Sequence, residues 1–302
     1  MSTGVLFGAG AGALWGLVFL APELVSGFTP LQLAIGRYLV FGLVSAGLIG
    51  SRWRSLTAKV QGREWLALAG LGLTGNTLYY VLLSAAVQQG GIAMASLVIG
   101  FLPVTVTIIG SRERDAVPLA RLAPSLLLCM ASAVCIGWQA LAGPAERVDV
   151  RLIGLLCAVG ALGSWTAYAV GNSRCLMRLP DISVHDWNLL LGLVTGAQAL
   201  ALVPVTLLAE QVPGAAGAWL DFVCVSIGVT LLASILGNAL WNRMSRLLPL
   251  TMVGQMVVFE TLFALLYGFL WEQRLPTVAE IAAFAFVISG VVACIGAHRR
   301  HG

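Results

Sequence analysis

Two charged side chains lie inside long apolar stretches of the chain, where a charge is costly and therefore informative. Arg37 and Glu260 are the only charged residues that we expect well within membrane-spanning helices. A charge at the centre of such a helix costs about 2.5–3.5 kcal/mol, so it usually serves a structural partner, a substrate or a proton. Both residues are candidates for a coupling or charge role, and for Arg37 a structural partner or a position near the membrane surface stays open.

Aromatic rings and side-chain amides share helix faces at three places. An amide that faces lipid would lack hydrogen bonds, so these faces should point into the protein. For each asparagine, hydrogen bonding between helices and contact with a substrate remain alternatives. The three sets, each spaced to fall on one face of a helix, are Asn76 with Tyr79 and Tyr80, Trp165 with Tyr168 and Asn172, and Asn238 with Trp241 and Asn242.

Most tryptophans fall near expected helix ends, where indole rings favour the membrane interface, but Trp15 and Trp165 lie mid-helix. Close helix packing beside nearby glycines and the wall of a cavity are both open for these two rings. The residues that we predict to contact a substrate are Trp15, Asn76, Tyr79, Tyr80, Phe101, Trp165, Tyr168, Asn238, Trp241 and Gln255.

The composition is that of an integral membrane protein. Of the 302 residues, 59% are hydrophobic and 10% are charged, whereas a soluble domain has about 25% charged residues. The formal charge of +4 comes from scattered basic residues rather than a patch, which argues against nucleic acid. The six cysteines show no CxxC spacing, so we expect no metal site, no disulfide framework and no cofactor.

Ten apolar stretches are each near the length of about 20 residues that an α-helix needs to cross a bilayer. Thirteen of the 17 basic residues fall on one side of the implied topology and three on the other, with Arg37 inside a helix. This bias predicts that both termini are cytoplasmic. The stretches are 4–22, 31–50, 66–87, 92–111, 119–141, 152–172, 187–208, 222–242, 250–271 and 278–297.

The chain also contains an internal duplication. The hexamer 75–80 (GNTLYY) returns as 237–242 (GNALWN), and Trp15 returns as Trp165. The first five stretches therefore correspond to the last five, which predicts one repeat over 1–145 and a second over 146–302. Five helices per repeat force the two halves into opposite orientations, the inverted-repeat plan of secondary transporters.

The chain resembles the drug/metabolite transporter superfamily, specifically its ten-helix EamA-type exporters. Thr261 stands where that family usually has proline, so a kink in this helix has no support here. The central tryptophans are similar to those of bacterial aromatic amino-acid exporters of the YddG type. The motifs that carry the resemblance are 12–19 (GALWGLVF), Pro30 with Arg37, 102–104 (LPV), 259–261 (FET) and 271–275 (WEQRL).

The resemblance implies export of small metabolites across a bacterial inner membrane, with a cavity built from both repeats. A cavity of rings and amides with two charges suits aromatic or hydrophobic amino acids, and organic cations or drug-like metabolites are the alternative. A channel or an intramembrane enzyme fits less well, because His185, His298 and His301 all lie in expected loops or the tail. The expected partners are a small-molecule substrate and the lipid bilayer; a monomer is plausible, and the sequence leaves the oligomeric state open.

Overall fold

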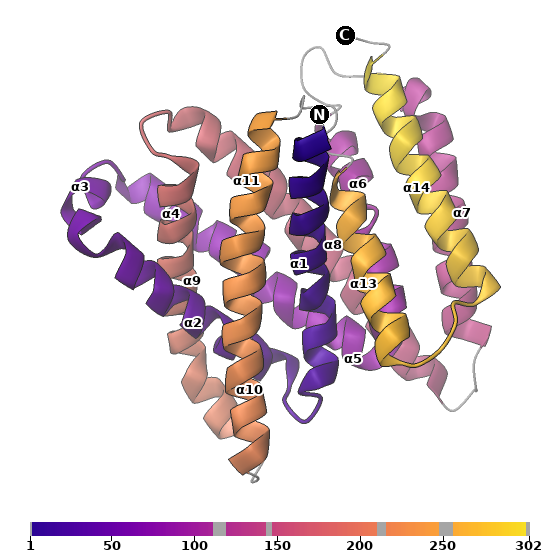
Figure 1. Cartoon of the computed structure of the whole chain (residues 1–302), viewed down its shortest axis with the longest axis horizontal. Coiled ribbons are helices and arrows are strands. Elements are labelled where there is room, and N and C mark those ends of the chain that lie inside the picture. Colours follow the sequence, from indigo (N-terminus) through magenta and orange to yellow (C-terminus); the bar gives the residue numbers. More distant parts are fainter. Residues whose placement is uncertain (1, 111–118, 143–146, 210–215, 248–255, 300–302) are drawn as a thin grey trace.

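The computed structural model describes residues 2–110, 119–142, 147–209, 216–247 and 256–299, and every regular element within them is helical (Figure 1). The elements in chain order are α1 (Ser2–Leu24), α2 (Pro30–Ile49), η1 (Gly50–Arg52), α3 (Trp53–Thr57), α4 (Gly62–Gly72), η2 (Leu73–Thr77), α5 (Leu78–Ile99), α6 (Leu102–Gly110), α7 (Leu119–Ala142), α8 (Val148–Arg178), α9 (Val184–Ala209), α10 (Ala216–Val229), η4 (Thr230–Gly237), α11 (Asn238–Leu247), α13 (Val257–Trp271) and α14 (Val278–Arg299).

Six helical stretches among the described residues are long and apolar enough to cross a bilayer. Three shorter apolar helices, within Leu122–Ile136, Val258–Trp271 and Val278–Ala293, accompany them. The helical membrane fold expected from the composition is therefore present. The predicted ninth stretch, 250–271, lies partly outside the described residues.

The predicted stretches 66–87 and 92–111 agree with the observed helices in part. Gly62–Ile99 is helical except at Gly91, whose φ of 85° favours glycine. This residue separates two helices at the connection that the sequence predicts between 87 and 92. A second break at Gly100 and Phe101 separates α5 from α6, so 92–111 is not one continuous helix. Pro103 is consequently the second residue of α6, a position where its missing N–H costs no helical hydrogen bond.

Local sequence signals explain where α2 begins. The Thr29 hydroxyl accepts a hydrogen bond from the Gln32 backbone N–H, and the Gln32 side chain accepts one from the Thr29 N–H. Pro30 occupies the first turn. This reciprocal capping box satisfies two backbone donors that the start of a helix otherwise leaves open.

Two π-helical turns occur at or beside the two copies of the repeated hexamer. The turn η2 contains Asn76, and the turn η4 ends immediately before Asn238. Each turn presents a backbone carbonyl to a side chain of another helix: Trp15 Nε1 donates to Ala233 O at 3.1 Å, and Ser164 Oγ donates to Thr74 O at 2.6 Å. Such wide turns concentrate at functional sites, because they re-aim the side chains that follow them.

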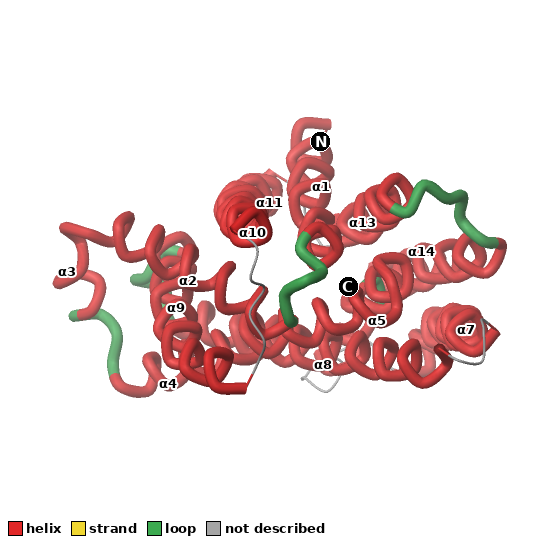
Figure 2. Tube along the Cα trace, turned by 90° about the horizontal axis from the view of Figure 1, so that it is seen from below, coloured by secondary structure: helices red, strands yellow, loops and turns green. Residues whose placement is uncertain are grey.

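The helices pack in pairs that join distant parts of the sequence (Figure 2). Helix α1 lies against α13 and α11, α5 against α8, α2 against α9, and α7 against α14. At the crossing of α2 and α9, a Cβ built on Gly42 would lie 2.7 Å from the Gly196 Cα, so glycines permit this close approach. The start of α1 and the ends of α11 and α14 lie at the same end of the molecule (Figure 1).

Candidate functional site

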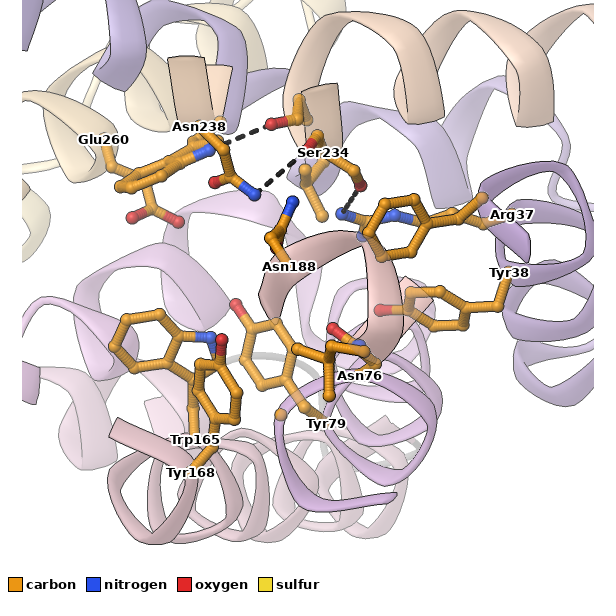
Figure 3. A pocket seen from close by; sticks show the side chains of 16 residues that line it. Arg37, Tyr38, Asn76, Tyr79, Trp165, Tyr168, Asn188, Ser234, Asn238 and Glu260 are labelled. Atoms are coloured by element: carbon orange, nitrogen blue, oxygen red, sulfur yellow. Dashed lines mark hydrogen bonds between the residues drawn. The ribbon is translucent and has the colours of Figure 1, made fainter. Parts of the chain in front are cut away.

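A cavity of about 100 Å³, here called the inner cavity, lies between helices from both halves of the sequence. Helices α1, α2, α5, α8, α9, α11 and α13 and the two π turns contribute to its wall (Figure 3). Its lining residues are Trp15, Val18, Arg37, Tyr38, Phe41, Gly75, Asn76, Tyr79, Trp165, Tyr168, Asn188, Leu191, Ala233, Ser234, Asn238 and Glu260.

Aromatic rings form much of the inner cavity. The ring centroids of Trp165 and Tyr168 are 5.7 Å apart, and those of Tyr79 and Trp165 are 6.3 Å apart. On the other side, Trp15 lies 4.9 Å from Trp241. These separations fall in the range at which aromatic rings attract one another, and the rings offer further faces to a planar ligand.

Arg37 brings a buried positive charge to the inner cavity. The residue is 9% exposed, and its Nη2 donates to the Ser234 hydroxyl at 3.1 Å. Its guanidinium carbon lies 4.5 Å from the centre of the Tyr80 ring, a cation–π contact. The Nε and Nη1 atoms are buried without a hydrogen-bond partner. Unsatisfied charged donors of this kind are costly, and they could donate hydrogen bonds to an anionic group.

Glu260 brings an ionisable carboxyl group to the same cavity. It lies in the first turn of α13, and its carboxylate points into the space beside Asn238 (Figure 3). Among the described residues, Arg37 and Glu260 form no ion pair with each other. The inner cavity therefore presents one guanidinium and one carboxylate that do not neutralise each other by direct contact.

Three amides supplement the charges. Asn76 Nδ2 donates to the Thr195 hydroxyl at 2.9 Å, and Asn238 Nδ2 donates to the Ser234 carbonyl at 2.9 Å. Each of these bonds fixes the amide nitrogen and leaves the side-chain carbonyl oxygen as an acceptor. Asn188 is the third amide and lies between Asn238 and Tyr79 in Figure 3.

A second cavity of about 310 Å³, the outer cavity, adjoins the first. It extends along α8 and α9 past Leu176 and Val184, toward the connection between these helices. Trp187 Nε1 donates to Asn172 Oδ1 at 2.8 Å in its wall. The two cavities adjoin and share six lining residues. The residues that line both are Trp15, Trp165, Tyr168, Asn188, Leu191 and Asn238.

Most of the residues predicted to contact a substrate come together at these cavities. Trp15, Asn76, Tyr79, Trp165, Tyr168 and Asn238 line the inner cavity together with Arg37 and Glu260, and Trp241 lines the outer cavity. Gln255 lies outside the described residues.

Two predicted residues lie elsewhere. Tyr80 is 2% exposed and packs edge-on against Tyr38, on the side of α5 that holds the Arg37 guanidinium. Phe101 occupies the break between α5 and α6 and packs in the apolar core with Val104. Because Leu73–Thr77 is a π turn, the spacing of 3.6 residues that put Tyr80 on the same face as Asn76 does not apply here.

The sequence pattern missed several wall residues, of which Asn188 and Ser234 are polar. Asn188 follows Trp187 at the start of an expected helix. A tryptophan at that position indicates the membrane interface, so no signal in the sequence placed Asn188 in a cavity. Ser234 lies four residues before Asn238, a spacing that would place both on one face of a regular α-helix and could have indicated it from the sequence. Among the described residues, no group of three His, Cys, Asp or Glu side chains is arranged to hold a metal ion.

Comparisons with known proteins show the family and the fold of the chain. Residues 2–138 match the EamA-like transporter family. The inner membrane protein YtfF of Escherichia coli strain K12 is 31% identical, over 98% of this chain and 96% of that protein. A solved crystal structure covers 96% of both chains with a TM-score of 0.62 and 21% identity, which shows a shared fold. The chain belongs to the EamA-like transporter family and is a membrane transporter.

Proposed function

We propose that the protein exports aromatic and other hydrophobic amino acids, and related small metabolites, across the bacterial inner membrane by alternating access. The chain then forms ten spanning helices in two inverted repeats, 1–145 and 146–302, with both termini in the cytoplasm. The similarity to an inner membrane protein of Escherichia coli supports the location.

The observation that carries this proposal is that Arg37 and Glu260 both line one aromatic cavity without forming an ion pair with each other. A zwitterionic amino acid carries a carboxylate that suits the open Nε and Nη1 of Arg37 and an ammonium group that suits Glu260. Binding would satisfy both buried charges at once. A ligand with only one charge would leave either Arg37 or Glu260 buried without an opposite charge, at a cost of several kcal/mol.

The rings around these charges favour an aromatic side chain. Trp165 and Tyr168 border both cavities, so a planar group between the charges and the outer cavity would contact them. Each ring contact contributes about 0.5–1.5 kcal/mol beyond the burial of apolar area. Asn188 and Asn238 line both cavities beside these rings and offer uncharged polar contacts.

Contacts that recur in the two halves support the inverted-repeat plan. Gly237 faces the Trp15 indole, with a built Cβ 2.8 Å from Nε1, and Gly75 faces the Tyr168 ring, with a built Cβ 2.2 Å from Cδ2. Each glycine opens one copy of the repeated hexamer, and each ring comes from the first helix of the other proposed repeat. Such symmetry is the usual basis of alternating access, in which one half rocks against the other.

Export of organic cations is the second candidate. Tryptophan faces and Glu260 would attract a cation, and Trp15, Trp165 and Trp241 all border the outer cavity. Arg37 opposes this function, because an incoming cation would meet a buried guanidinium with no carboxylate against it.

Counterflow into proteoliposomes distinguishes these functions. Three radiolabelled compounds share one ring: phenylalanine, phenethylamine without the carboxylate, and 3-phenylpropionate without the ammonium group. Phenylalanine should be taken up fastest, and Glu260→Gln should remove most of its advantage over 3-phenylpropionate. Preferential uptake of phenethylamine would support the cation exporter, and a failure of phenylalanine and its hydrophobic relatives to move would refute amino-acid export.

A further inference from the structure

A further pocket, separate from the inner and outer cavities, lies between the start of α4 and the end of α8. It has a volume of about 240 Å³ and is here called the basic pocket. The connection from α8 to α9 adjoins it, at the end of the molecule where α1 begins (Figure 1). Its lining residues are Arg63, Glu64, Ala67, Cys175, Arg178 and Leu179.

The two arginines of the basic pocket have no acidic partner among the described residues. Arg63 and Arg178 are both exposed, and the one side-chain hydrogen bond of Arg178 runs to the Cys175 sulfur at 3.5 Å. Glu64 instead accepts the backbone N–H of Gln61 at 3.0 Å and thereby caps α4. Two guanidinium groups at one opening form a suitable site for a phosphate or phosphodiester, which each can bind through two hydrogen bonds.

The surroundings of the basic pocket are those of a membrane surface. Leu66 and Met177 flank it and are 76% and 71% exposed, as expected for side chains that face lipid tails. Trp53 and Trp65 form a ring pair with centroids 6.4 Å apart beside the start of α4. Tryptophan pairs of this kind favour the level of the lipid headgroups.

The inner wall of the basic pocket is apolar, through Ala67, Leu179 and the buried Cys175. A ligand that fits must therefore combine an anionic group at the opening with an apolar body beneath it. A free phosphate ion satisfies only the first condition. A phospholipid satisfies both, with its phosphodiester at the arginines and its acyl chains along Leu66 and Met177.

We propose that the basic pocket binds the headgroup of an anionic phospholipid, with the phosphodiester held between Arg63 and Arg178. Basic pockets between membrane helices recognise anionic lipids through this combination of charge and depth. Bound lipid ties α4 to α8, the helix that carries Trp165 and Tyr168 in the wall of the inner cavity. The site does not depend on which substrate the protein moves.

Lipid titration of the purified full-length protein tests the proposal. Thermal unfolding is followed in a neutral detergent with added phosphatidylglycerol, phosphatidylcholine or inorganic phosphate. Phosphatidylglycerol should raise Tm in a saturable way, and Arg63→Gln with Arg178→Gln should raise the half-saturating concentration at least tenfold. Arg54→Gln is the matched control, because Arg54 is an exposed arginine of the neighbouring α3 that does not line the pocket.

Each other outcome counts against the site. Equal stabilisation by phosphatidylcholine would show that charge is not recognised, and equal stabilisation by inorganic phosphate would show an ion site rather than a lipid site. An unchanged half-saturating concentration in the double variant would overturn the assignment to these arginines. If the double variant does not fold, the single variants Arg63→Gln and Arg178→Gln take its place, and each should raise the half-saturating concentration at least threefold.

Discussion

The indole rings of Trp15 and Trp241 lie 4.9 Å apart, and the rings of Trp165 and Tyr79 repeat this contact at 6.3 Å. In the sequence duplication Trp15 corresponds to Trp165, and Trp241 corresponds to Tyr79. The same contact thus occurs twice, each time between residues from opposite halves of the sequence, and both copies border the two adjoining cavities. The first prediction concerns the copy that lies deeper in the inner cavity.

Trp165→Ala should lower phenylalanine uptake about 5- to 100-fold, because Trp165 supplies ring contacts worth about 0.5–1.5 kcal/mol each. Uptake is measured in proteoliposomes that hold equal amounts of folded protein. Trp138→Ala is the matched control, since Trp138 is 69% exposed on α7 and lines neither cavity. Equal uptake by the two variants would remove Trp165 from the proposed site.

Arg37→Gln should raise the KM for phenylalanine about 10- to 150-fold, the equivalent of a lost charged hydrogen bond of about 1.5–3 kcal/mol. Phenethylamine has no carboxylate, so its uptake should not fall in this variant. Ser234→Ala removes the present partner of Arg37 Nη2 and keeps the charge, and it should change the KM far less. A uniform loss for both compounds would indicate a structural role for Arg37.

Gly75→Ala should destabilise the protein by about 1–3 kcal/mol, because the added methyl group would overlap the Tyr168 ring. Gly70→Ala provides the comparison, since a Cβ on Gly70 meets no atom within 4 Å. In that open position alanine favours the helix, so Tm should rise slightly. Thermal unfolding in detergent measures both variants, and similar shifts would argue that Gly75 does not fix the Tyr168 ring.

Glu280→Gln should lower stability by about 1–3 kcal/mol through loss of charged hydrogen bonds. The Arg274 guanidinium donates to both Glu280 oxygens, at 2.6 and 2.7 Å, and Glu280 is 2% exposed. Arg52→Gln is the control, because Arg52 is 46% exposed in its ion pair with Asp186, so this pair should contribute less. An equal Tm change in both variants would contradict the distinction between these pairs.

The same cluster predicts how this stability depends on pH. Hydrogen bonds to Glu280, and secondarily to Glu272, raise the pKa of Arg274 above its usual range. A base with a raised pKa contributes stability below its unfolded pKa and loses that contribution only as the pH rises through the folded value. The Tm difference between the wild type and Glu280→Gln should therefore not diminish between pH 7 and about pH 10. A smaller difference at the alkaline end would show that Arg274 loses its proton there.

The sequence was sufficient for the features that depend on composition and repetition. Apolar stretches predicted the helical membrane fold, and mid-helix tryptophans with neighbouring amides predicted six residues that line the inner cavity. These signals are strong because a polar side chain that faces lipid lacks hydrogen bonds, which is costly. Such a side chain must therefore face the interior of the protein. The buried charges Arg37 and Glu260 stood out for the same reason.

The positions of the predicted residues that lie outside the cavities depend on backbone details that leave little trace in composition. Tyr80 shares a face with Asn76 only in a regular α-helix, and the π turn changes that relation. Phe101 lies in a break between α5 and α6, inside the stretch 92–111 that the sequence predicted as one helix. Asn188 reaches the cavity because α9 packs against α2, a pairing that no local pattern specifies.

The crossing of α2 and α9 has a mechanical consequence. Gly42 and Gly196 meet there backbone to backbone, and the Phe41 and Ser45 side chains of α2 pack against Gly192 one turn away. Interdigitated ridges resist rotation of one helix over another, but two bare backbones can turn in contact. The helices also belong to opposite proposed repeats and carry Arg37 and Asn188 a short distance along their length. In the alternating access proposed above, the Gly42–Gly196 contact is suited to act as the pivot, the point that stays in contact while the walls around it exchange sides.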